Sequence, residues 1–125
     1  MEIVLNKLVS NIKDNIPGYI GVSVTEMSSG ESLVSDSILE GFDPELASAF
    51  NVEIINAKRK TMQILNIVDE LNDIQFNLSN QVHIINISAN GEYFIYLALN
   101  KEKANLGITK KLLFKYKEEL NNELQ

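Results

Sequence analysis

The longest regular pattern of apolar positions runs through residues 43–71. Apolar side chains recur there at three- and four-residue spacing and no Gly or Pro follows Pro44, so the pattern predicts one helix of about seven turns. Asp43 suits the N-cap, because its carboxylate accepts hydrogen bonds from the first free N–H groups. Pro44 suits the first helical position, where a missing N–H costs nothing. The helix is expected to end near Leu71.

The apolar surface of this helix is wider than a single sheet requires. A helix that lies on one sheet needs an apolar stripe of about 100°, but here the apolar residues make two neighbouring faces. One face has Leu46, Phe50, Ala57, Ile64 and Val68, and the other has Ala47, Ile54, Ile55, Met62 and Leu65. The pattern therefore predicts a second neighbour for this helix in addition to a sheet.

Shorter patterns flank the long helix on both sides. Helical spacing of Leu5, Leu8 and Ile12 predicts a first helix over residues 1–15, which a Pro-Gly pair then ends. A last helix is predicted over residues 101–125, with two asparagines as alternative N-caps. Alternating polar and apolar residues, separated by turn signals, predict strands over residues 19–27, 32–37, 74–79, 82–88 and 93–99.

The strand over residues 93–99 is apolar at every position, which indicates that both of its faces are covered. Asn90-Gly91 before it is a strong hairpin signal. The element order is then α-β-β-α-β-β-β-α. We expect a single α+β domain over residues 1–125, with a five-stranded antiparallel sheet. The long helix would cover one face of the sheet, and the two terminal helices the other.

Composition narrows the functional classes. The 125 residues include no Cys, one His and one Arg, with a net charge of −6. The absence of Cys excludes a disulfide scaffold, thiol catalysis and cysteine zinc sites, and it fits the cytoplasm. No apolar run approaches the roughly 18 residues that span a bilayer, and the charged first fifteen residues do not form a signal peptide. Membrane insertion is not expected.

Basic residues are concentrated in two places, at Lys58, Arg59 and Lys60 and again over residues 101–117. Because the chain as a whole is acidic, we do not expect it to bind nucleic acid. The tribasic run fans around a predicted helix, so a solvated face is favoured, and contact with an acidic partner is the alternative. Arg59 as an arginine finger is disfavoured, since a finger normally lies on a mobile loop.

No residue pattern indicates an enzyme or a cofactor site. A phosphate-binding glycine loop is missing, and the lone His83 has no companion at metal-ligand spacing, so it is interpreted as structural. Asp69, Glu70 and Asp73 are interpreted as the solvated end of the long helix, although acidic side chains there oppose the helix dipole. A basic partner is the alternative explanation for this cluster.

Four stretches of the sequence resemble the Roadblock/dynein light chain family, which shares a fold with profilin-like and longin domains. The stretches are the entry into the first strand, the first hairpin, the start of the long helix and the A-N-L-G-I entry into the last helix, at residues 17–22, 28–35, 42–49 and 104–109. The chain departs from the family at residues 71–73, where members often have a glycine-rich turn.

The resemblance implies a dimer in which third strands join edge to edge and the long helices lie against each other. It also implies a platform that binds or regulates Ras-like small GTPases, or a light chain of a motor complex; one bacterial branch activates a polarity or motility GTPase. We therefore expect a homodimer and assign its interface to the apolar residues of the long helix and third strand, Ile54, Ile55, Met62, Leu65, Ile74, Phe76 and Leu78. Lys58, Arg59 and Lys60 are the candidate partner-binding residues.

Three functional hypotheses follow. The first is a non-enzymatic homodimeric scaffold that binds a Ras-like small GTPase. The second is a GTPase-activating protein that acts in trans on such a GTPase. The third is a small-molecule sensor with a pocket between the sheet and the terminal helices, against which the bulky apolar strand over residues 93–99 argues.

Overall fold

The structure is a computed structural model that describes residues 1–124, apart from the side chain of Leu124. Gln125, the predicted end of the last helix, lies outside the described residues. The elements follow the predicted order and confirm an α+β fold. They are α1 (Glu2–Asn15), β1 (Tyr19–Glu26), β2 (Ser32–Ser37), α2 (Pro44–Ile64), β3 (Asp73–Asn77), β4 (Gln81–Ile87), β5 (Tyr93–Asn100) and α3 (Leu106–Leu124).

The five strands form one sheet in the order β2-β1-β5-β4-β3, and every neighbouring pair is antiparallel. β5 lies at the centre, and its residues from Phe94 to Leu99 are all buried. The prediction that this strand is covered on both faces is therefore confirmed. The two edges of the sheet are β2 and β3.

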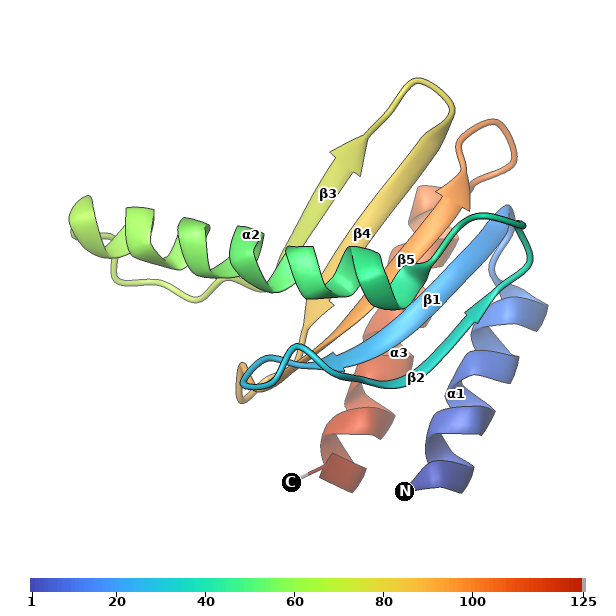
Figure 1. Cartoon of the computed structure of the whole chain (residues 1–125), viewed down its shortest axis with the longest axis horizontal. Helices are drawn as coiled ribbons and strands as arrows, with labels where there is room; N and C mark the ends of the chain where they lie inside the picture. Colours follow the sequence, from blue (N-terminus) through green and yellow to red (C-terminus); the bar gives the residue numbers. More distant parts are fainter. Residues whose placement is uncertain (125) are drawn as a thin grey trace.

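The sheet separates two hydrophobic cores of unequal size, with α2 on one face and α1 and α3 on the other (Figure 1). α1 and α3 lie on one face and bury the larger core, which includes Ile12, Leu97 and Leu113. α2 crosses the other face over the smaller core, around Ile55 and Phe94. Figure 1 also shows that α2 runs on past the β3 edge. The sheet of one chain therefore does not cover the whole length of α2.

Small residues let the chain around α2 pack closely on β1. The buried hydroxyl groups of Ser23 on β1 and Ser48 on α2 share a hydrogen bond. Gly21 lies beneath the ring of Phe42, and a Cβ atom there would come within 3.0 Å of that ring and of a β2 carbonyl oxygen. The start of α2 is thus fixed on the sheet, and Asp43 caps it by accepting from the N–H groups of Glu45 and Leu46.

The predicted end of the long helix at Leu71 is wrong, because α2 ends at Ile64. Asn66 takes the left-handed conformation with φ +57°. The Asn66 N–H donates to the Gln63 carbonyl, and the Ile67 N–H donates to the Met62 carbonyl at 2.9 Å. This pair of bonds is the Schellman motif that closes many helices, usually with Gly at the left-handed position. Residues 65–72 then run as a connector into β3.

Asn66 supplies a prediction about stability. Left-handed backbone costs most non-glycine residues about 1–2 kcal/mol, and Asn tolerates it better because its short polar side chain bonds locally. We expect Asn66→Ala to lower the free energy of unfolding by about 1 kcal/mol, whereas Asn66→Gly leaves it equal or slightly higher. Urea denaturation of the two variants checks this, and equal losses in both would contradict the role of the φ angle.

The last helix begins at Leu106, so the structure selects the second of the two N-caps that the sequence left open. Asn105 is its N-cap, with the side-chain oxygen accepting from the Ile108 N–H at 3.1 Å. Asn100, the alternative cap, instead accepts from the Lys103 N–H and holds a turn that precedes the helix.

Candidate interaction surface

An apolar stripe lies on the solvent side of α2. It consists of Leu46, Phe50, Ile54, Ala57, Thr61 and Ile64, and we call these residues the α2 stripe. Leu46 and Phe50 are each 59% exposed and Ile64 is 69% exposed, while the opposite side of the helix buries Ser48 and Ile55. Contiguous apolar surface of this kind marks contact sites on soluble proteins.

The free edge of β3 lies beside this helix. The Asn72 carbonyl accepts from the Ile87 N–H, and the Leu78 N–H donates to the Gln81 carbonyl, both at 2.9 Å. Backbone groups of an antiparallel strand alternate in direction, so the groups of Asp73, Gln75 and Asn77 point away from β4. No strand pairs with this side of β3 in the described part of the chain. β3 therefore presents backbone donors and acceptors to an incoming strand.

The two faces of β3 differ in polarity. Ile74 and Phe76 pack against the core beneath α2, and the intervening residues, Asp73, Gln75 and Asn77, lie on the opposite face because side chains alternate along a strand. β3 also lacks the Lys or Pro that commonly protects an exposed edge. A strand added here would extend the sheet and continue its apolar face beneath the part of α2 that runs past the β3 edge.

The structure distributes the predicted interface residues among three environments. Ile54, Leu65 and Leu78 are exposed, at 40%, 62% and 46%. The partly buried members are Met62, Ile74 and Phe76. Ile55 is fully buried beneath α2, so it holds the helix on the sheet and is not accessible to a partner.

Leu46, Phe50 and Ile64 were outside the predicted interface set, although the sequence placed them on one apolar face. No local pattern in the sequence indicates which side of this helix faces the sheet. Ser48 and Asn51 are polar in sequence, yet they are buried with Ile55 and mark the sheet-facing side. Because the small residue Ser48 packs closely on β1, the side of α2 that includes Ser48 faces the sheet. The more apolar side, the α2 stripe, is therefore exposed to solvent.

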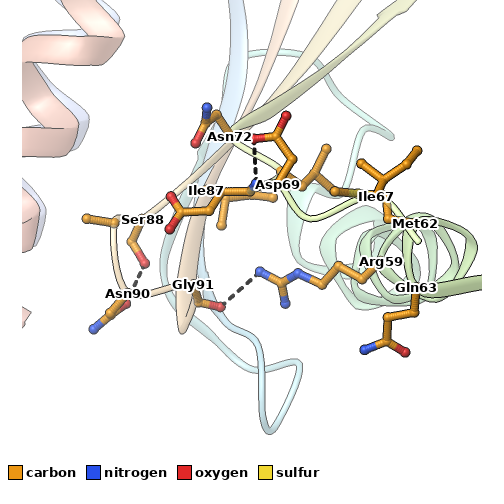
Figure 2. A pocket seen from close by; sticks show the side chains of 13 residues that line it. Arg59, Met62, Gln63, Ile67, Asp69, Asn72, Ile87, Ser88, Asn90 and Gly91 are labelled. Carbon is orange, nitrogen blue, oxygen red and sulfur yellow. Dashed lines mark hydrogen bonds between the residues drawn. The ribbon is translucent and has the colours of Figure 1, made fainter. Parts of the chain in front are cut away.

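The tribasic segment does not form a single patch. Lys58 and Lys60 are exposed, whereas Arg59 is partly buried and reaches beneath the helix. Figure 2 shows its guanidinium directed at the Gly91 carbonyl, to which Nη2 donates at 3.4 Å. This contact draws Arg59 onto the β4–β5 turn, and the side chain lies between two open hollows of about 330 and 580 Å³.

The predicted acidic cluster does not lie at a helix end, because the helix stops earlier. Asp69 and Glu70 belong to the connector and line the smaller hollow together with Arg59, and Figure 2 shows Asp69 across this hollow from Arg59. Asp73 begins β3. Within residues 1–124, the acidic and histidine side chains form no group of three that could hold a metal ion. The helices described there also include none that is long and apolar enough to cross a membrane.

His83 lies in a hydrogen-bonded aromatic cluster on the α2 side of the sheet. Its Nδ1 is 2.9 Å from the Tyr96 hydroxyl and its Nε2 is 2.7 Å from Gln81 Oε1. An amide oxygen only accepts, so Nε2 carries the proton and Nδ1 accepts from Tyr96. The Phe42 ring packs beside both rings. Burial lowers the pKa of His83 and raises the pKa of Tyr96 to about 12.

The lowered pKa of His83 predicts a pH dependence of stability. In the unfolded chain His83 has its ordinary pKa near 6.5. In the folded chain its pKa is lower, so the imidazole binds its proton only at lower pH. Stability is therefore full above that pH and falls as the pH decreases towards the folded pKa. We expect the melting temperature to fall between about pH 7.5 and 5.5, above the range in which most carboxylates titrate. His83→Gln should flatten this decrease, and an unchanged slope in that variant would contradict the assignment.

Comparison with known proteins identifies the fold. No protein-family model matches the chain, and no curated protein sequence matches it. The gliding protein MglB from Thermus thermophilus matches with a TM-score of 0.80 at 11% identity, over 97% of this chain and 88% of that chain. A Roadblock/LC7 domain from Streptomyces avermitilis matches with a TM-score of 0.78 at 9% identity, over 99% and 97%.

A structure described as MglB with tetrameric arrangement also matches, with a TM-score of 0.73 at 14% identity, over 96% of this chain and 84% of that chain. Similarity at these identities concerns the fold and leaves partners open. The arrangement of α2 over a five-stranded sheet, first suggested by four short sequence stretches, is that of the Roadblock/LC7 fold.

Proposed function

We propose that this protein is a non-enzymatic, homodimeric module that binds a Ras-like small GTPase. One observation carries the proposal: α2, which presents the exposed α2 stripe, runs past an unpaired β3 edge whose apolar face lies on the α2 side of the sheet. Together they offer both the hydrogen bonds and the apolar area that a partner copy would use.

A dimer with its two-fold axis beside β3 would cover both the free β3 edge and the exposed surface of α2. Two antiparallel β3 strands centred on Gln75 would pair the outward backbone groups of Asp73 with those of Asn77 in the other copy. The part of α2 beyond the sheet edge would then lie over the joint, against the same helix of the partner. Ala57 and Thr61 are small, and they leave room for larger stripe residues such as Phe50 from the second helix.

The GTPase assignment is supported by the family resemblance, which implies platforms for Ras-like small GTPases, and by the fold shared with MglB, a gliding protein. The tetrameric arrangement described for MglB supports self-association as a property of this fold. A dimer would also present a wider surface than one chain does, as a globular partner requires.

The side chains support a scaffold over the two alternatives. Arg59 donates to the Gly91 carbonyl beneath α2, so it is not poised to enter another protein's active site. A sensor pocket between the sheet and the terminal helices would occupy space that Leu8, Leu97, Leu113 and their neighbours fill.

GTPase binding can be tested with the small Ras-like GTPases of the native host, each loaded with GDP or with a non-hydrolysable GTP analogue. We expect one of them to bind the dimer in one nucleotide state, and single-turnover GTP hydrolysis to proceed at its unassisted rate. Accelerated hydrolysis would replace the scaffold by an activator acting in trans. Absence of binding to every GTPase, with the dimer intact, would overturn the GTPase assignment alone.

A further inference from the structure

The charges on α3 are arranged against the helix dipole. All four of its lysines, Lys110, Lys111, Lys115 and Lys117, come before its three glutamates, Glu118, Glu119 and Glu123. A helix is stabilised by acidic residues near its N-terminus and basic residues near its C-terminus, and a Lys placed before a Glu is the weaker order for side-chain pairs. Local helix stability therefore does not explain this order of charges.

The α3 lysines also lack partners within the described chain. The ion pair found there joins Lys13 on α1 to Asp36 on β2, at 3.6 Å, and involves no residue of α3. Lys111 and Lys115 are both exposed and lie one helical turn apart, where like charges repel. In a chain with net charge −6, the first half of α3 therefore presents lysines that form no ion pair within the described residues.

An exposed aromatic ring lies within the basic surface. Phe114 is 61% exposed. Residues three and four positions apart are neighbours on a helix, so Lys110 and Lys111 flank the ring on its N-terminal side, and Lys117 and Glu118 flank it on its C-terminal side. Aromatic residues inside a charged rim are the usual anchors of protein interfaces.

We propose that the first half of α3 is a docking surface for an acidic segment of another protein, with an apolar side chain of that segment packed on Phe114. A short segment can lie over Phe114 and the lysines that precede it in the chain, and it leaves Glu119 and Glu123 uncovered. An anionic membrane is less suitable, because a flat surface would also press against Glu118 and Glu119. α3 lies on the opposite face of the sheet from α2 (Figure 1), so this site is separate from the proposed dimer surface on α2 and β3.

The test uses the full chain labelled with ¹⁵N and two capped probe peptides. One peptide is glutamate-rich with two leucines one helical turn apart, and its match has glutamine in place of every glutamate. We expect only the acidic peptide to bind, with chemical-shift changes confined to residues 106–117. Lys111→Glu with Lys115→Glu should weaken binding about tenfold or more, and Phe114→Ser by about fivefold. Lys58→Glu with Lys60→Glu on α2 is the matched control and should change affinity less than about twofold.

Three results would overturn the proposal. The first is absence of binding by the acidic peptide, and the second is equal weakening by the α2 and α3 double variants, which would indicate unspecific attraction. The third is stronger binding to phosphatidylserine vesicles than to the peptide, with phosphatidylcholine vesicles as blank and the same dependence on Lys111 and Lys115. All substituted side chains are exposed, so unchanged melting temperatures should accompany each variant.

Discussion

Replacing Phe50 by glutamate is expected to convert the proposed dimer into a folded monomer. Phe50 is 59% exposed in one chain, so the substitution should leave the fold and the stability of the monomer nearly unchanged. In the dimer the same position would be covered by the second α2, and an unpaired carboxylate buried there costs about 3–5 kcal/mol. The dissociation constant should then rise roughly 100-fold or more, which analytical ultracentrifugation over a concentration series measures.

Ala49→Glu supplies the matched control for this variant. Ala49 is exposed on the same helix, one residue earlier and about 100° around the helix axis from Phe50. It should keep the dimer intact. Dissociation by both glutamates, or by neither, would argue that the stripe is not the contact surface.

A second large effect is expected from proline in β3. Proline removes one backbone donor, and it is tolerated on an edge strand where that donor faces solvent. The N–H of Gln75 points away from β4, so Gln75→Pro should remove a hydrogen bond only from the joint between two copies. We expect a folded monomer. In a two-fold interface the substitution occurs in both copies, so the joint between the two β3 strands loses two hydrogen bonds and both strand edges are distorted.

Ile74→Pro tests the same argument from the other side of the strand. The Ile74 N–H points towards β4, so proline at this position should break the pairing of Ile74 with Ile85. The free energy of unfolding of the chain itself should then fall by about 1–3 kcal/mol or more. Urea denaturation and light scattering on the two variants separate the outcomes. If Gln75→Pro unfolds the chain as strongly as Ile74→Pro, the strand directions inferred here are wrong.

Much of the fold was predictable because the local signals agreed with the tertiary structure. The turn residues before β1 and between β4 and β5 end their elements where expected, and strand alternation matched the two cores. The end of α2 was not predictable in the same way. Asn66 takes a conformation that usually indicates Gly, and the connector after it is apolar enough to continue a helical pattern.

The candidate surface was predictable in kind, and its residues only in part. An over-wide apolar helix indicated a missing neighbour, and the structure leaves one side of α2 in solvent. Which side faces the sheet depends on Ser48 meeting Ser23, a contact between residues 25 positions apart that no local pattern contains. For that reason Ile55 was placed at the surface and Phe50 was left out of it.

The central claim is that two copies associate through α2 and β3, and the molar mass in solution tests it most directly. Size-exclusion chromatography with multi-angle light scattering at micromolar concentration should give twice the chain mass for the unmodified protein. The Phe50→Glu and Gln75→Pro variants should give the single-chain mass. A single-chain mass for the unmodified protein under the same conditions would contradict the claim.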